Sequence, residues 1–122
     1  MKYDISDEIN EILRQGVYFK RRRMYDEANK IYDQILKIDG PSGLLYIAMA
    51  KTYACQMRYN EAIRLLKLAN KACLDELGIE DPNCLMHIHQ LENRNRMSRG
   101  EFLEYMRKVA GNSNYNFPGT NF

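Results

Sequence analysis

The sequence has no apolar stretch long enough to span a membrane, and its first residues lack the apolar core of a secretion signal. It also has little net charge, because 18 basic and 16 acidic residues leave only +2 at pH 7. A balance this small gives no bulk attraction to nucleic acids or to membrane surfaces. We therefore expect neither a membrane nor a nucleic acid as a partner.

Cysteine is scarce as well. Three cysteines, an odd number without a close pair, cannot form a disulfide framework or a zinc site made of four cysteines. Cys55, Cys73 and Cys84 each lie in or beside an apolar helical stretch, so we interpret them as reduced thiols of the core. Reduced thiols favour a cytoplasmic location.

The only histidines are His87 and His89, with Cys84 three residues before the first of them. Residues two apart on a helix point to nearly opposite sides, so only Cys84 and His87 share a face. Two ligands do not complete a metal site. We predict that the protein binds no metal and needs no cofactor.

Motifs of catalysis are also missing. The sequence has no glycine-rich phosphate loop, no nucleophile elbow, and no serine, histidine and acid that its pattern places together. We therefore predict that the protein is not an enzyme.

An internal repeat occupies the stretch between Glu11 and Cys73, with a period of about 34 residues. At this offset small residues align with small ones and bulky apolar residues with bulky ones. The aligned pairs are Ile12 with Tyr46, Gly16 with Ala50, Phe19 with Tyr53, Tyr25 with Tyr59, Glu27 with Glu61, Ala28 with Ala62, and Ile31 with Leu65. A unit of this length with two helical patterns predicts an all-α, helix-turn-helix solenoid. The small residues let the two helices of a hairpin approach closely, and the apolar interior must be covered by a neighbouring hairpin.

These residues resemble the tetratricopeptide repeat (TPR) family, in which an aromatic, small, aromatic, tyrosine, alanine, aromatic pattern fills one repeat unit. The strings Tyr25-Asp26-Glu27-Ala28 and Tyr59-Asn60-Glu61-Ala62 are the most specific part of the match. The resemblance implies a right-handed solenoid that binds proteins. Its first helices would line a concave groove that holds a peptide or helix of a partner protein.

Helical spacing of apolar residues predicts about six helices in one domain, residues 1–110. The two repeats cover about residues 9–42 and 43–76. The first four expected helices run from Ser6 to Arg22, Tyr25 to Ile38, Ser42 to Met57, and Tyr59 to Leu77, with Gly78 as a left-handed stop.

Residues 82–110 predict an atypical third hairpin that caps the open end of the solenoid. Its first helix follows Asp81-Pro82, and its second begins at the capping box Ser98-Arg99-Gly100-Glu101. The remaining residues, 111–122, are rich in asparagine and glycine without periodicity, which predicts a flexible tail.

The family's groove positions, carried over one by one, fall on the first helix of each repeat. They are Asn10, Leu13, Val17, Lys20 and Arg21 in the first repeat, and Leu44, Ile47, Lys51, Ala54 and Cys55 in the second. Most of these residues are apolar, so the implied ligand is an apolar or amphipathic segment, with Lys20 and Lys51 meeting acids at its margin. Family members that bind chaperone C-termini have a lysine and an asparagine where this chain has Leu13 and Val17, which argues against that ligand.

Alternatives remain at this point. Two clear repeats are fewer than the roughly three that a stable stack needs, so a second copy of the chain could supply the missing interface in a homodimer. A small TPR-type secretion chaperone is suggested by size and repeat type alone. The dense basic run from Lys20 to Arg23 is interpreted as solvated turn residues, in preference to a phosphate-binding patch or a nuclear-localisation string.

Overall fold

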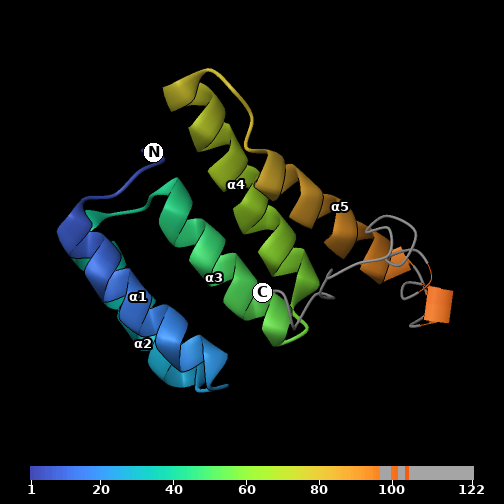
Figure 1. Cartoon of the computed structure of the whole chain (residues 1–122), viewed down its shortest axis with the longest axis horizontal. Helices are drawn as coiled ribbons and strands as arrows, with labels where there is room; N and C mark the ends of the chain where they lie inside the picture. The colour runs from blue at the N-terminus through green and yellow to red at the C-terminus, as the bar shows by residue number, and fades with distance from the viewer. Residues whose placement is uncertain (97–99, 102–103, 105–122) are drawn as a thin grey trace.

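The computed structural model describes residues 1–96, 100–101 and 104, and regular structure within them is helical apart from one isolated bridge between Lys2 and Ser42. The predicted all-α class is therefore confirmed. Most of the expected sixth helix, and the whole of the tail at 111–122, lie outside the described residues. Five helices have both of their ends within the described residues: α1 (Asp7–Arg21), α2 (Tyr25–Asp39), α3 (Gly43–Cys55), α4 (Tyr59–Leu77) and α5 (Pro82–Arg96) (Figure 1).

The helices pack mainly against their neighbours in the sequence. α1 packs along α2, α3 packs along α4, and α5 packs on α4, while α3 also touches α2 and α1. In Figure 1 the α1–α2 pair lies at one end of the molecule and α5 at the other, with α3 and α4 between them. No helix in the described part of the chain is both long enough and apolar enough to cross a membrane.

Helix ends follow the local sequence signals in most places. Ser6 caps α1 by accepting a hydrogen bond from the Ile9 amide at 3.3 Å. Gly78 ends α4 with a φ of 75°, the left-handed conformation that glycine adopts without strain. As expected, α4 is longer than its counterpart, with 19 residues against 15 in α2.

The expected bounds of α3 are wrong by a few residues. Ser42 is the cap and not the first helical residue, because its Oγ accepts from the Leu45 amide at 3.2 Å. Pro41 therefore precedes the cap and does not lie in the first helical turn. At the other end Met57 has a left-handed φ of 63°, so the helix stops at Cys55.

The repeat period recurs in the backbone of the two turns within the helix pairs. Arg23 and Met57 occupy equivalent positions, and both have positive φ, at 61° and 63°. Few residues other than glycine adopt this conformation. Its recurrence at the offset of the internal repeat shows that the two turns share one backbone conformation. The hydrogen bond that closes each turn is 2.9 Å long in both: Met24 N donates to Phe19 O, and Arg58 N donates to Tyr53 O.

Gly16 of α1 lies directly against the ring of Tyr32 in α2. A Cβ atom added at Gly16 would lie 2.5 Å from Cε1 of Tyr32, closer than real Cβ contacts come. The equivalent residues of the second helix pair are Ala50 and Leu66, both 0% exposed. Because leucine has no ring, it leaves room there for the alanine methyl group.

Tyr32 also joins the first helix pair to the second through its hydroxyl group. Thr52 Oγ1 of α3 donates its proton to Ala48 O at 3.0 Å, so Tyr32 Oη is the donor in the 3.1 Å hydrogen bond to Thr52. Tyr32 and Thr52 are at most 1% exposed. Because both hydroxyl groups are buried and hydrogen-bonded, this pair fixes how α2 and α3 sit against each other.

The described core consists of two apolar clusters, and α3 contributes to both. The first joins α1, α2 and α3 through Ile9, Leu13, Ala28, Tyr32, Ile35, Leu45 and Ala48. The second joins α3, α4 and α5 through Ala50, Ala54, Ala62, Ile63, Leu65, Leu66, Ala69, Cys84, Ile88 and Leu91. Since α3 is buried on two sides, its apolar residues run most of the way around the helix.

The close contact at Gly16 generates a stability prediction. Gly16→Ala should lower the free energy of unfolding by about 1–3 kcal/mol, because the new methyl group overlaps the Tyr32 ring. This expected loss of stability is opposite in sign to the effect of helix propensity, which by itself favours alanine over glycine by about 1 kcal/mol. Urea denaturation measures the change.

A double variant supplies the control. Gly16→Ala combined with Tyr32→Leu reproduces the Ala50 and Leu66 pair of the second helix pair, so it should lose less stability than the two single changes added together. Strictly additive losses would show that the ring does not require glycine at this position.

Candidate functional site

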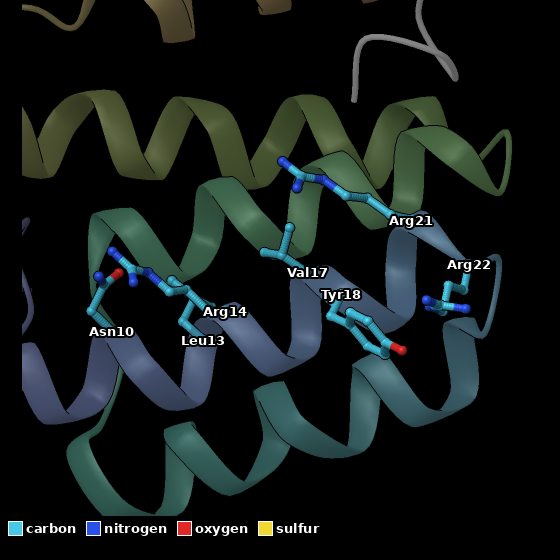
Figure 2. Close-up of a pocket in the computed structure, with 7 residues that line it drawn as sticks. All are labelled: Asn10, Leu13, Arg14, Val17, Tyr18, Arg21 and Arg22. Atoms are coloured by element: carbon cyan, nitrogen blue, oxygen red, sulfur yellow. The ribbon is translucent and has the colours of Figure 1, made fainter.

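Two hollows lie along the first helices of the helix pairs. The one that we call the α1 pocket has a volume of about 720 Å³ and is lined by Asn10, Leu13, Arg14, Val17, Tyr18, Arg21 and Arg22 (Figure 2). The one that we call the α3–α5 pocket has a volume of about 420 Å³ and is lined by Tyr3, Leu44, Ile47, Lys51, Asp81, Asn83, Cys84, Met86 and His87.

Most of the predicted groove residues line one of these pockets. Asn10, Leu13, Val17 and Arg21 line the α1 pocket, and Leu44, Ile47 and Lys51 line the α3–α5 pocket. The offset of the internal repeat relates Asn10 to Leu44, Leu13 to Ile47, and Val17 to Lys51. The two pockets therefore use equivalent positions of the repeat.

Three predicted residues are placed differently from expectation. Ala54 is 1% exposed and belongs to the core, so its side chain has almost no surface for a partner. Leu13 is 8% exposed and packs in the first cluster while it borders the α1 pocket. Lys20, expected as a solvated residue at the groove margin, is 7% exposed. Packing of α1 buries Leu13 and Lys20, and packing of α3 buries Ala54, which the groove pattern does not predict.

The α1 pocket combines an apolar floor with arginines. Figure 2 shows that its labelled side chains come from α1 and from Arg22, the residue that follows the helix, with Val17 and Arg21 on the side nearer to α3. The guanidinium carbon of Arg22 lies 4.4 Å from the centroid of the Tyr18 ring, a cation–π contact. Arg14 pairs with Glu11 at 3.1 Å on the exposed surface. This pocket is suited to an apolar group with a nearby negative charge.

Asp81 organises one wall of the α3–α5 pocket. Its Oδ1 accepts from the amides of Asn83 and Cys84, at 2.9 and 3.4 Å, as expected of the residue that caps α5. Its Oδ2 accepts from the Tyr3 hydroxyl at 2.6 Å and from the Cys84 thiol at 3.5 Å. The carboxylate is therefore fully engaged within the protein.

These contacts determine whether Asp81 and Cys84 are protonated. Burial by itself raises the pKa of Asp81, but the hydrogen bonds from Tyr3, Asn83 and Cys84 outweigh it, so the pKa is lowered. Burial and the nearby Asp81 carboxylate raise the pKa of the Cys84 thiol to about 12. Cys84 is thus a protonated hydrogen-bond donor, and its thiol is not available as a nucleophile.

Tyr3 belongs to an N-terminal strap, residues 2–4, that sequence reasoning missed. Gly43 N donates to Lys2 O at 2.8 Å, and Leu44 N donates to Tyr3 O at 2.9 Å. These are the first amides of α3, which have no partner inside the helix. The strap is held further by an ion pair of Lys2 with Asp39 at 2.5 Å, and by a hydrogen bond from Tyr3 N to Glu76 at 2.9 Å.

His87 completes the pocket on the α5 side. It is 6% exposed, and burial together with the neighbouring Lys51 lowers its pKa. Its Nδ1 lies 3.4 Å from Gln90 Oε1. Cys84 and His87 share a helix face as the sequence predicts, but within the described residues no group of three or more histidine, cysteine or acidic side chains is placed to hold a metal ion.

Comparison with known proteins finds no relative of this chain. No protein-family model, no curated protein and no solved structure matches the chain. The repeat geometry and the two pockets are therefore the features from which a function is inferred.

The contact between Tyr3 and Asp81 generates a pH-dependent prediction. Tyr3→Phe removes a hydrogen bond to a charged group and should cost about 1.5–3 kcal/mol of unfolding free energy at pH 7. Because the pKa of Asp81 is lowered in the folded protein, this stabilisation is present above the unfolded aspartate pKa of about 3.9. It is lost as the pH falls through the folded value.

Urea denaturation at neutral and at acidic pH tests this expectation. The gap in stability between wild type and Tyr3→Phe should shrink as the pH falls. Tyr18→Phe is the matched control, because Tyr18 is 52% exposed and should change stability little at either pH. A gap that stays constant down to low pH would mean that Tyr3 does not act through the Asp81 carboxylate.

Proposed function

We propose that this protein is a protein-recognition module of the tetratricopeptide type, a right-handed helical solenoid whose concave side binds an apolar or amphipathic segment of a partner protein. Support comes from the two pockets, which use positions of α1 and α3 that are one repeat apart. A surface that recurs along consecutive helices suits an extended or helical segment, which contacts it at more than one point.

The α3–α5 pocket supplies an anchor position for such a segment. Leu44 and Ile47 form its α3 side and are half-buried, so each keeps apolar surface open to the pocket. Met86 on the α5 side is 38% exposed, and its flexible side chain adapts to different apolar groups. A large apolar side chain that enters the pocket would bury all three surfaces at once, which is how anchors contribute most of an interface's affinity.

Self-assembly into a homodimer is the second candidate, and a different surface favours it. Exposed apolar residues gather at the C-terminal end of α4 and in the segment that follows. Leu74, Leu77 and Ile79 are 44%, 57% and 63% exposed, respectively. An apolar surface of this kind is a common site of protein association. The secretion-chaperone alternative has no comparable observation in its favour.

Leu44→Glu tests recognition through the α3–α5 pocket. Leu44 lies in the first turn of α3, where an acidic side chain is favourable to the helix dipole, so the fold should keep its helical signal and melting temperature. We expect partner capture from the native source to fall at least about tenfold, since a charge now enters the apolar anchor site. Quantitative mass spectrometry of the captured proteins measures the change. Ile47 is a poorer site for the substitution because it also packs against the second cluster.

Leu68→Glu provides the control for that experiment. Leu68 is 36% exposed on α4 and lines neither pocket. The Leu68→Glu variant should therefore capture the same partner proteins as wild type. If Leu44→Glu captures the same proteins as wild type, binding through this pocket is refuted.

Light scattering coupled to size exclusion separates the dimer from the monomer. If the α4 surface joins two copies, wild type should elute as a dimer, and Leu77→Glu should elute as a monomer with unchanged helical content. A wild-type monomer at all accessible concentrations would exclude self-assembly and leave partner recognition as the remaining proposal.

A further inference from the structure

Lys20 is a buried cation that lacks a counter-charge. Its side chain is 7% exposed, and within the described part of the chain its ammonium group has neither an ion pair nor a hydrogen bond. Removing a charge from water without a partner is costly. Lysine reduces that cost by extending its ammonium group to the surface, and Lys20 Nζ keeps a small contact with solvent, but an exposure of 7% leaves the residue poorly hydrated.

Repeat packing does not explain why a cation lies here. The equivalent residue of the second helix pair is Ala54, which is buried in the apolar core. A small apolar residue is therefore compatible with this position of the repeat. The first helix pair carries a charge in a place where the second does without one.

Two other cations make the position of Lys20 less favourable still. Burial is the main cause that lowers the pKa of Lys20, and the positive charges of Lys51 and Arg21 lower it further, whereas only the Cys55 thiol acts in the opposite direction. Arg21 lines the α1 pocket and Lys51 lines the α3–α5 pocket. We call Lys20, Arg21 and Lys51 the cation cluster, and it lies between the two pockets.

The acid in the adjoining pocket does not neutralise this cluster. The Asp81 carboxylate accepts hydrogen bonds from Tyr3, Asn83 and Cys84, which use both of its oxygens. His87, also in that pocket, feels Lys51 as a like charge that lowers its pKa. The cluster thus has an excess of positive charge, and its buried member Lys20 lies in partly dehydrated surroundings, where an incoming anion is attracted strongly.

We propose that the cation cluster binds an aspartate or glutamate side chain of the partner segment whose apolar residue enters the α3–α5 pocket. This inference rests on the proposed function and narrows the partner to an acidic amphipathic segment. The carboxylate gives Lys20 the counter-charge that it lacks and relieves the repulsion among the three cations. Lys51 belongs to both the cluster and the pocket, so the acid and the apolar residue must be near neighbours on the partner surface.

Synthetic peptides test this pairing. The probes are fluorescent amphipathic peptides in which glutamate is placed at varying distances from one leucine, and matched peptides carry glutamine instead. For the best spacing we expect wild type to bind the glutamate peptide about tenfold or more tightly than its glutamine partner, in fluorescence anisotropy at low salt. The preference should weaken as salt is added.

Lys20→Met is the decisive variant, because methionine keeps an unbranched side chain and removes only the charge. It should abolish the preference for glutamate while the melting temperature stays the same or rises, as expected when an unpaired buried charge is removed. Lys30→Met is the matched control, since Lys30 is an exposed residue of α2 that lines neither pocket. It should keep the full preference.

The other outcomes are equally informative. The acid subsite is the proposed binding of a partner carboxylate by the cation cluster. If glutamate and glutamine peptides bind equally, and Leu44→Glu abolishes the binding of both, the acid subsite is overturned and recognition through the apolar pocket remains. A glutamate preference that survives Lys20→Met, or a large fall in the melting temperature of that variant, would also overturn the subsite. If phosphoserine peptides bind more tightly than glutamate peptides, the cation cluster recognises a phosphate group, and the proposed carboxylate ligand is overturned. Failure of every peptide to bind would overturn the groove and the subsite together.

Discussion

The side chain of Tyr32 holds three helices together, and the arrangement of the rest of the molecule depends on it. Its ring fills the space beside Gly16 of α1, where a Cβ atom would lie 2.5 Å from the ring. Its hydroxyl donates across the helix-pair boundary to Thr52 of α3, which in turn donates to Ala48 O. Because these groups are buried, no water replaces a lost contact. One residue therefore contributes both to the close approach of α1 and α2 and to the position of α3 against them.

Once α3 is seated in this way, the surfaces of the first helices follow. Equivalent turns at Arg23 and Met57 return the chain with the same geometry, so that residues one repeat apart occupy matching places on α1 and α3. The N-terminal strap then covers the amides at the start of α3, and Tyr3 joins it to Asp81 at the start of α5. The α3–α5 pocket is thus bounded by three segments that are far apart in the sequence.

Two charged residues with little exposure, Asp81 and Lys20, differ in what the protein provides for them. Asp81 receives hydrogen bonds from a hydroxyl, a thiol and two amides, so its charge is stabilised and its pKa is lowered. Lys20 has no such partners among the described residues, and its neighbours Arg21 and Lys51 carry the same sign. The first charge serves the fold by joining the strap to α5. The second has no such role in the described fold, since the equivalent residue of the second helix pair is the apolar Ala54, and in our proposal it pairs with the acid of a ligand.

The sequence by itself determined what depends on neighbours along the chain. The repeat period, the Ser6 cap, the glycine stop at Gly78 and the cap at Asp81 are encoded within a few residues or within one repeat, and the structure contains each of them. Only the tertiary structure decided which groups meet across the fold. Tyr3 and Asp81 are 78 residues apart and share no local pattern, and Lys20 belongs to a basic run that indicates solvated turn residues. Burial and pairing arise from how whole helices pack, and the spacing of residues along one helix does not contain that information.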